Sequence, residues 1–553
     1  MGNIQIAPRS ALVSNPPSTP PVRHRSRPAT WLVTVAILVL VPALLLTVGQ
    51  MLSARSAGNV RPAASSAPRS VTALGGSSTA PGSTAAPAST DQAPAAETPA
   101  ASPRTPTPRA TAPAAPKPTG GPPAPRQTYY VATNGSDAAD GSIGAPWRTF
   151  AKAAATVPAG ATVLARRGTY GPFTISRSGR SGDPTRFAAY PGESVTIDGN
   201  ASRSNVILIT GAHDIELDHL TVRGAATQYG AGVRVEEGSY RVTIQRSVLR
   251  DNRSFGVKIA DSTEVTVRNN TIAKNETGIE ISRAGRGVVI DGNRIRDNDR
   301  MVTSSRGGNG IVFHLTTGSI QVTNNQLWGN RAPHRNDAGY DGGAFEVYGA
   351  SNLVISGNVL WDNNNAMETG TDGTPCSNNR FTRNIVRGLG SVAGETTGLI
   401  LRCASKMLVA HNTFDGLDDY AFYLTDSGSF AASIHDLRII DNIVVRGRAF
   451  SLDSGLPGDV QIDYNVVNPG GSSATYSDYI AYVHGFGNTD SLAELRGWTG
   501  YEAHGLKVAP HFVNAAAGNY HLRADSPVID TGRSYGERYS GSAPDPGRYE
   551  WSG

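Results

Sequence analysis

A repeat carrying one asparagine per copy constrains the fold of this chain more than any other feature. The copies that begin at Gly232, Gly256 and Gly278 read GVRVEEGSYRVTIQRSVLRDN, GVKIADSTEVTVRNNTIAKN and GIEISRAGRGVVIDGNRIRDN. Each copy has a short alternating run, a polar turn, a second run and, after an asparagine, a third apolar pair. Alternation of this length predicts three short strands per copy. The recurring asparagines are Asn270, Asn293, Asn325, Asn358, Asn384, Asn412, Asn442 and Asn465.

This asparagine column predicts how the copies stack. Strands at a spacing of about 4.8 Å would bring successive side-chain amides within hydrogen-bonding distance along a buried turn. We therefore predict an all-β domain over residues 128–553: a right-handed parallel β-helix with three strands per coil and an asparagine ladder.

Both ends of this domain carry helix signals. A helix starting at Pro146 is expected to cap the first coil, which would otherwise expose its core and strand edges. Near the C-terminus, the segment from Ser491 to Glu494 is a capping box that predicts a second short helix. The apolar face predicted for the first helix comprises Trp147, Phe150, Ala151 and Ala154.

The N-terminal region predicts a membrane anchor. Residues 31–49 are uncharged, and 19 residues at a rise of about 1.5 Å span a bilayer core. Arginines crowd the preceding residues, so 1–30 is predicted to be a basic cytoplasmic tail and 31–49 a transmembrane signal-anchor helix. The folded domain would then be extracellular. Small residues around Arg55 leave an alternative, in which a signal peptide is cleaved and the protein is secreted.

Residues 50–127 differ sharply in composition from the rest of the chain. They are rich in Pro, Ala, Ser and Thr and hold 15 of the 35 prolines, which predicts a disordered, semi-extended stalk. The tail and the stalk together carry +9 of formal charge against +5 for the whole chain, which leaves −4 for the folded part. A mildly acidic domain argues against a nucleic-acid partner. We expect a monomer.

Motifs outside the repeats resemble those of a known superfamily. The opening residues Tyr129-Tyr130-Val131, with Pro146-Trp147 and Gly168-Thr169-Tyr170, are similar to the entry module of secreted bacterial β-helix proteins. With the asparagine column, they resemble the pectate-lyase-like superfamily, whose fold hosts lyases, hydrolases, epimerases and adhesins. Polygalacturonase signatures are out of order or missing, and we found no match to the calcium-binding aspartate cluster of family-9 pectate lyases. We therefore expect no specific enzyme family.

Two expanded turns, 297–309 and 329–342, locate the candidate site. Long loops on a regular repeat usually carry function, and these two should overhang the coils that follow them. Strand alternation then predicts one outward row of ionisable residues, the candidate catalytic set together with Tyr340 from the second turn. That row comprises His314, Glu346, Glu368 and Arg402.

Other residues are candidates for binding roles. Glu346 and Glu368 would repel each other unless one is protonated, a cation such as Ca²⁺ bridges them, or neighbouring cations compensate. Cys376 and Cys403 fall on adjacent coils and are predicted to form a disulfide. If the site lies elsewhere, the earlier outward residues around Lys258 are the alternative. The candidate substrate-binding residues are Trp328, Trp361, Tyr348, His334, Arg335, Asp337 and Asp341.

Three functions are compatible with these residues. The first is a polysaccharide lyase that cleaves a uronate-containing polymer by β-elimination, with Arg402 or Ca²⁺ neutralising the carboxylate and His314 or Tyr340 removing the α-proton. The second is a glycoside hydrolase with Glu346 and Glu368 as its carboxylate pair. The third is a non-catalytic surface protein that binds cell-wall glycan.

Overall fold

A computed structural model describes residues 126–283, 285–301, 307–333, 339–388, 396–425, 434–453, 455–470 and 479–553. The predicted cytoplasmic tail, the membrane helix at 31–49 and nearly all of the stalk lie outside these residues. Within the described part of the chain, no helix is both long and apolar enough to cross a membrane.

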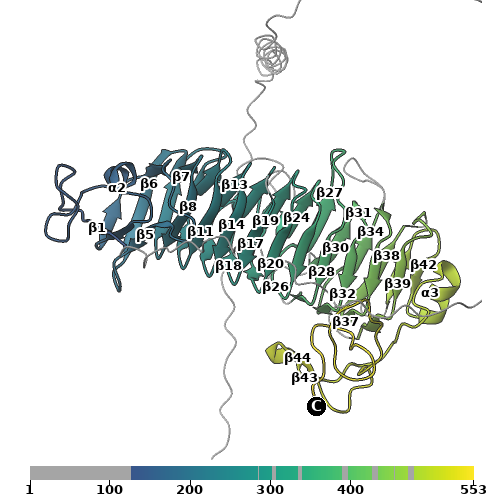
Figure 1. Cartoon of the computed structure of the whole chain (residues 1–553). Helices are drawn as coiled ribbons and strands as arrows, with labels where there is room; N and C mark the ends of the chain where they lie inside the picture. The colour runs from purple at the N-terminus through teal and green to yellow at the C-terminus, as the bar shows by residue number, and fades with distance from the viewer. Residues whose placement is uncertain are drawn as a thin grey trace, which may run out of the picture. The chain divides into compact units, whose positions relative to one another are not determined.

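Three sheets, built almost wholly from parallel strands, form the described domain (Figure 1). The first sheet contains β1 (Thr128–Val131), β2 (Thr162–Ala165), β5 (Thr185–Ala189), β8 (His213–Asp218), β11 (Tyr240–Gln245), β14 (Thr263–Arg268), β17 (Val288–Asp291), β20 (Ile320–Thr323), β25 (Leu353–Ser356), β28 (Arg380–Thr382), β32 (Leu408–Ala410), β36 (Arg438–Ile440) and β39 (Gln461–Asp463).

The second sheet carries the candidate site. It contains β4 (Phe173–Ile175), β7 (Asn205–Thr210), β10 (Ala231–Glu236), β13 (Phe255–Ala260), β16 (Thr277–Ser282), β19 (Asn309–His314), β24 (Gly343–Tyr348), β27 (Asn365–Gly370), β30 (Thr397–Leu401), β34 (Tyr420–Leu424), β38 (Arg448–Leu452), β41 (Ala481–Val483) and the antiparallel β42 (Gly487–Thr489).

The third sheet closes each coil. It contains β3 (Gly168–Tyr170), β6 (Val195–Arg203), β9 (Thr221–Ala225), β12 (Val248–Arg250), β15 (Thr271–Ala273), β18 (Arg294–Arg296), β21 (Gln326–Trp328), β26 (Val359–Trp361), β29 (Ile385–Arg387), β33 (Thr413–Asp415), β37 (Ile443–Val445) and β40 (Val466–Asn468). Each coil contributes one strand to each sheet, and the inward Ile, Val, Leu and Phe side chains form one continuous core. The structure therefore has the predicted three-stranded coil.

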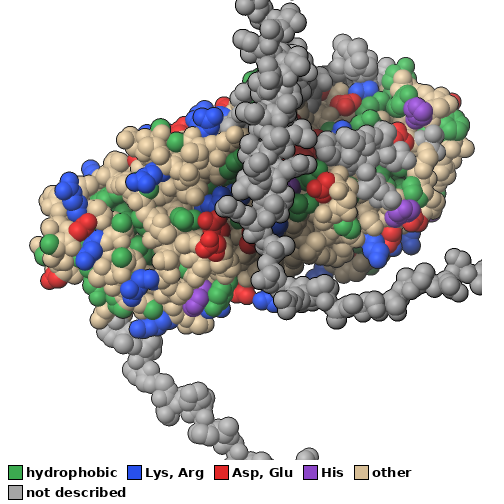
Figure 2. Space-filling view, turned by 90° about the horizontal axis from the view of Figure 1, so that it is seen from above, with side chains coloured by type: hydrophobic (Ala, Val, Ile, Leu, Met, Phe, Trp, Pro, Cys, Tyr) green, Lys and Arg blue, Asp and Glu red, His purple; other side chains and the backbone are tan. Residues whose placement is uncertain are grey.

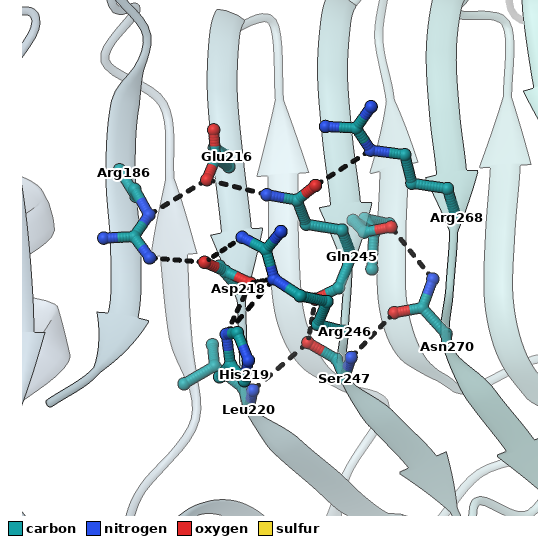
Figure 3. A network of polar contacts seen from close by, with 11 residues as sticks. Arg186, Glu216, Asp218, His219, Leu220, Gln245, Arg246, Ser247, Arg268 and Asn270 are labelled. Atoms are coloured by element: carbon teal, nitrogen blue, oxygen red, sulfur yellow. Dashed lines mark hydrogen bonds and ion pairs between the residues drawn. The ribbon is translucent and has the colours of Figure 1, made fainter. Parts of the chain in front are cut away.

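The asparagine ladder lies in the turn between the first and third sheets. At each step the side-chain amide donates to the Oδ1 of the next asparagine, as from Asn293 to Asn325 (3.0 Å) and from Asn325 to Asn358 (3.0 Å). The residue before each ladder position adopts the left-handed conformation, for example Asn324 with φ 56°. Ser247 precedes the first rung, where its backbone N–H donates to Asn270 (Figure 3).

A second asparagine ladder, which the sequence analysis missed, lies in the turn between the third and second sheets. Its rungs follow those of the first ladder by five residues, so the repeat itself contained the signal. The same amide-to-Oδ1 bonds join them, such as Asn275 to Asn298 (3.0 Å). Its members are Asn252, Asn275, Asn298, Asn330 and Asn363.

The N-terminal helix differs from the prediction in where it starts. Helix α2 (Phe150–Thr156) begins after the N-cap Thr149, whose hydroxyl accepts the N–H of Lys152. Trp147 instead forms a bridge with Val131, and Ala151 is exposed. The cap therefore places the helix start three residues after Trp147, and the packed face of the helix shifts accordingly.

The chain folds back on itself at its C-terminal end. Helix α3 (Leu492–Thr499) begins at the predicted N-cap Ser491. The following segment, with β43 (Phe512–Asn514), the 3₁₀ turn η1 (Ala515–Ala517) and β44 (Asn519–Leu522), lies beside β37 of the third sheet (Figure 1). There it forms a small second core comprising Ile443, Val445, Val466, Leu522 and Val528. This segment leaves the outer face of the second sheet to the candidate site.

Candidate functional site

The outward side chains of the second sheet form the candidate site. Strand pairing places Lys258, Glu280, Val312, Glu346 and Glu368 at the same level of five consecutive strands, β13 to β27. We call this set the first outward row.

A second outward row lies two residues further along the same strands. It contains Ser282, His314, Tyr348 and Gly370, and Arg402 follows at the next strand, one residue beyond the end of β30. The structure therefore divides the predicted single row between two. Alternation determines which side of the sheet a residue faces, but not its level along the strand.

Glu346 and Glu368 are direct register partners, and Arg402 compensates part of their charge. Two carboxylates facing each other on neighbouring strands repel. The Arg402 guanidinium donates to Glu368 Oε1, and both side chains of this ion pair are about a third exposed or less, at 31% and 25%. The arrangement joins two acids and one cation at a half-buried surface.

His314 and Tyr348 lie beside these carboxylates on adjacent strands. Their ring centroids are 5.5 Å apart. Burial, followed by the negative charges of Asp372 and Glu346, raises the pKa of the Tyr348 phenol. The phenol therefore stays protonated at neutral pH and can donate a hydrogen bond, while the imidazole of His314 can act as a base.

A disulfide and a threonine hold Arg402 in place. Cys376 and Cys403 are joined by a disulfide, with Cα atoms 5.6 Å apart. Thr369 Oγ1 accepts the backbone N–H groups of both Arg402 and Cys403, each at 3.1 Å. The backbone that carries the guanidinium is thus tied to β27 at two points.

A second ion pair lies on the first outward row, where the sequence analysis placed only an alternative site. Lys258 Nζ donates to Glu280 Oε1 at 2.6 Å, and the ammonium lies 4.6 Å from the centre of the Phe255 ring. These side chains are only 12% and 2% exposed. A lysine and a glutamate at the same level of adjacent copies were the signal for this pair.

The second expanded turn, 329–342, contains five of the predicted site residues. Tyr340 forms β23 (Tyr340–Asp341), which pairs with β22 (Ala332–Pro333), and the Arg331 guanidinium lies 5.7 Å from its ring centre. Because β23 precedes β24, Tyr340 and Asp341 lie at the opposite end of that strand from Tyr348. His334, Arg335 and Asp337 lie outside the described residues.

Trp328 and Trp361 lie on the third sheet, away from the two outward rows. Their rings stack with centroids 4.7 Å apart and planes at 9°. The Arg296 guanidinium lies 5.7 Å from the centre of the Trp328 ring. The aromatic faces that would bind a sugar ring are thus largely in contact with the protein itself. The geometry therefore favours packing of this pair over the predicted binding of substrate.

The described donors do not by themselves fit a calcium ion. Among the described residues, no group of three or more His, Cys, Asp or Glu side chains is arranged to hold a metal. Glu346 and Glu368 supply two carboxylates, one of them already paired with Arg402, whereas Ca²⁺ takes about six to eight oxygen ligands.

A denser polar network lies on the first sheet (Figure 3). Asp218 is fully buried and accepts hydrogen bonds from Arg186 and from both arms of Arg246 (2.9 and 2.7 Å). Glu216 accepts from Arg186 and from Gln245, each at 2.9 Å. Because these charges satisfy one another, we interpret this network as structural.

Charges of both signs are distributed over the surface. Figure 2 shows one face on which acidic and basic side chains lie interspersed among hydrophobic and other ones.

The fold and the repeats identify the family. The chain belongs to the family described as Pel9A-like, right-handed β-helix region, whose model matches residues 129–419, just over half of the chain. This match confirms the resemblance to pectate-lyase-like β-helix proteins and is narrower than it.

Individual relatives are more distant. The chain is 34% identical over 139 residues to the uncharacterized protein YwoF of Bacillus subtilis, which covers 23% of this chain and 29% of that protein. It is 26% identical over 242 residues to pectate lyase PEL9 of Emericella nidulans, with coverage of 42% and 47%. The chain thus spans less than half the length of either relative.

Solved structures resemble the chain in part. The crystal structure of pectate lyase Pel9A is 20% identical, with a TM-score of 0.42 and coverage of 77% of this chain and 97% of that one. The complex of XylC with xylose is 13% identical, with a TM-score of 0.43 and coverage of 65% and 86%.

Proposed function

We propose that this protein is a polysaccharide lyase that cleaves a uronate-containing polymer by β-elimination on the outer face of the second sheet. The observation that carries the proposal is the Glu368–Arg402 ion pair beside Glu346, with His314 and Tyr348 on the adjoining row. Membership in the Pel9A-like family and the relative named pectate lyase PEL9 support it.

Elimination makes three chemical demands. The C–H bond next to the uronate carboxylate breaks, a C=C bond forms, and the glycosidic C–O bond breaks. A cation must stabilise the charge that develops on the carboxylate, a base must take the α-proton, and an acid must protonate the leaving oxygen.

The chain offers one group for each demand. The Arg402 guanidinium would bind the uronate carboxylate, His314 would take the α-proton, and the protonated Tyr348 phenol would donate to the leaving oxygen. Arg402 must then share its hydrogen bonds between Glu368 and the substrate. Since Tyr340 lies at the other end of β24, we assign it no part in proton transfer.

A glycoside hydrolase is the second candidate. One observation favours it: Glu346 and Glu368 are register partners on adjacent strands, which suits the carboxyl separation of about 5–5.5 Å in retaining enzymes. Against it, Glu368 is already held in an ion pair with Arg402, whereas a retaining hydrolase needs one of its two carboxyl groups to donate a proton.

The products separate these candidates. The full-length protein is incubated with polygalacturonate, alginate and a neutral polysaccharide. Unsaturated ends from a polyuronate support the lyase, ordinary reducing ends support the hydrolase, and a bound but intact polymer supports a binding protein. A parallel incubation with a chelator tests whether turnover needs a divalent cation.

A further inference from the structure

A hollow lies at the N-terminal end of the second sheet, the sheet that carries the candidate site. It has a volume of about 640 Å³ and lies between α2 and the end of β6. Its apolar side includes Ala155, Phe173 and Leu208, and its polar side is formed by residues 202–204, Ser-Arg-Ser.

An irregular strand builds the polar side. β6 spans nine residues, and its pairing with β9 shifts register between Asp198 and Arg203. Asn200 and Ala201 adopt left-handed conformations, with φ of 51° and 48°. Such a bulge bends the strand, so residues 199–204 stand away from the coil and face α2. This expanded segment was not among the turns singled out from the sequence.

The hollow is aligned with the candidate site. Leu208, on its floor, is the register partner of Arg234, which pairs with Lys258 of the first outward row. Five strand steps therefore separate Leu208 from Glu346, or roughly 24 Å at about 4.8 Å per step. A polysaccharide lying along the sheet would span this distance with several sugar residues.

The chemistry of the hollow suits an acidic sugar. Arg203 is exposed and forms no ion pair with any described residue, so its guanidinium is available to a ligand carboxylate. The two flanking serine hydroxyls can bind sugar hydroxyls, and the apolar side can contact the face of a pyranose ring.

We propose that this hollow is a distal subsite that binds a uronate residue of the same polymer chain that occupies the candidate site; the assignment rests on the proposed function. Its occupation would tether long substrates and contribute nothing to oligosaccharides too short to reach it.

The test measures binding without turnover. Dissociation constants for polygalacturonate, alginate and a uronate trisaccharide are determined with the full-length His314→Ala protein, which lacks the proposed base, and with the same protein carrying Arg203→Ala. We expect Arg203→Ala to lower the ratio of polymer affinity to trisaccharide affinity about tenfold, the loss of one charge-assisted contact. Arg294→Ala, which removes an exposed arginine from the third sheet, is the matched control and should leave this ratio unchanged.

A second variant, Leu208→Glu, places a negative charge on the floor of the hollow and should lower the same ratio, with folding checked by thermal melting. An unchanged ratio in Arg203→Ala, or equal losses for polymer and trisaccharide, would overturn the subsite. Failure of every polyuronate to bind would overturn both the subsite and the lyase. A polymer that binds through Arg203 but is never cleaved would support the subsite and contradict the proposal that the protein is a lyase.

Discussion

At the scale of single residues, Arg402 is the centre of the candidate site. It forms an ion pair with Glu368, its backbone is held by Thr369, and its neighbour Cys403 is in a disulfide. Its guanidinium is positioned by the fold but half-buried, a combination that suits binding of a substrate carboxylate.

Replacing Arg402 should therefore separate activity from stability. We expect Arg402→Ala to lower kcat/KM on a polyuronate by about a hundredfold or more, because the developing carboxylate charge loses its partner. Its Tm should move by only a few degrees, because an ion pair at a partly exposed surface contributes little to stability. Arg402→Lys should recover part of the activity, and Arg294→Ala is the control. Steady-state kinetics measure kcat/KM, and calorimetry measures the Tm. Full activity in Arg402→Ala would place the site elsewhere.

The residues of the site could be predicted from the sequence only in part. Alternation correctly places His314, Glu346 and Glu368 on the outer face, where all three are partly exposed. It does not give the level of a residue along its strand. The repeats align Gly310 with Gly343, whereas the strand pairing joins Asn309 to Gly343, one residue away. The contacts of Arg402 depend on a turn with no repeat pattern, so they needed the structure.

At the scale of elements, the asparagine ladders set the register of the coils. Asn358 shows what each rung does: its amide donates to Val322 O (2.9 Å) and Asn384 Oδ1 (3.0 Å), and its own Oδ1 accepts from Asn325. The asparagine column was readable from the sequence because each rung satisfies the same buried backbone groups on every coil.

Removing one rung should be costly. Asn358→Ala leaves several buried donors and acceptors unpaired, at about 1–3 kcal/mol for each. We expect the free energy of unfolding to fall by about 3 kcal/mol or more, measured by denaturant titration. Gln326→Ala, a substitution of an exposed residue on β21 of the third sheet, should lower the free energy of unfolding by under about 0.5 kcal/mol. A near-neutral Asn358→Ala would mean that the ladder does not stabilise the coils.

The last rung predicts a pH dependence. Asn465 donates its side-chain amide to Glu502 (2.6 Å), and burial raises the pKa of this carboxyl to about 8. The folded state thus holds a proton that the unfolded state releases above its ordinary pKa of 4.5, so the contribution to stability is present at low pH and declines as pH rises toward about 8.

Glu502→Gln isolates this contribution, because the other buried groups with shifted pKa values, Asp441 and His411 among them, are common to both proteins. The Tm of the natural protein should fall relative to that of the variant as pH is raised from about 4.5 to about 8. A constant difference in Tm over this range would show that Glu502 does not titrate with folding.

At the scale of the whole molecule, the sequence combines a predicted membrane anchor with a folded β-helix domain. The anchor at 31–49 and the stalk stay predictions from composition, because they lie outside the described residues. The docking of residues 501–553 on the third sheet could not be predicted from the sequence, because it joins segments far apart in the chain. Tyr520, for example, donates to Asp415 at 2.6 Å across 105 positions.

We propose that residues 31–49 anchor the protein in the cell membrane with the β-helix outside. Cell fractionation should then find the intact chain in the membrane pellet, and protease added to whole cells should remove the domain. Deletion of residues 31–49 should abolish membrane association. A released product that begins near residue 56 would instead establish cleavage and secretion.

We propose that the outer face of the second sheet breaks a glycosidic bond by elimination, without adding water. The most direct test is digestion of a polyuronate by the full-length protein in water labelled with heavy oxygen, followed by mass spectrometry of the products and ultraviolet detection of unsaturated ends. We predict products with an unsaturated non-reducing end and no heavy oxygen beyond that of a control in which finished products are incubated alone. Saturated products carrying heavy oxygen at the new reducing end would contradict the account and identify a hydrolase.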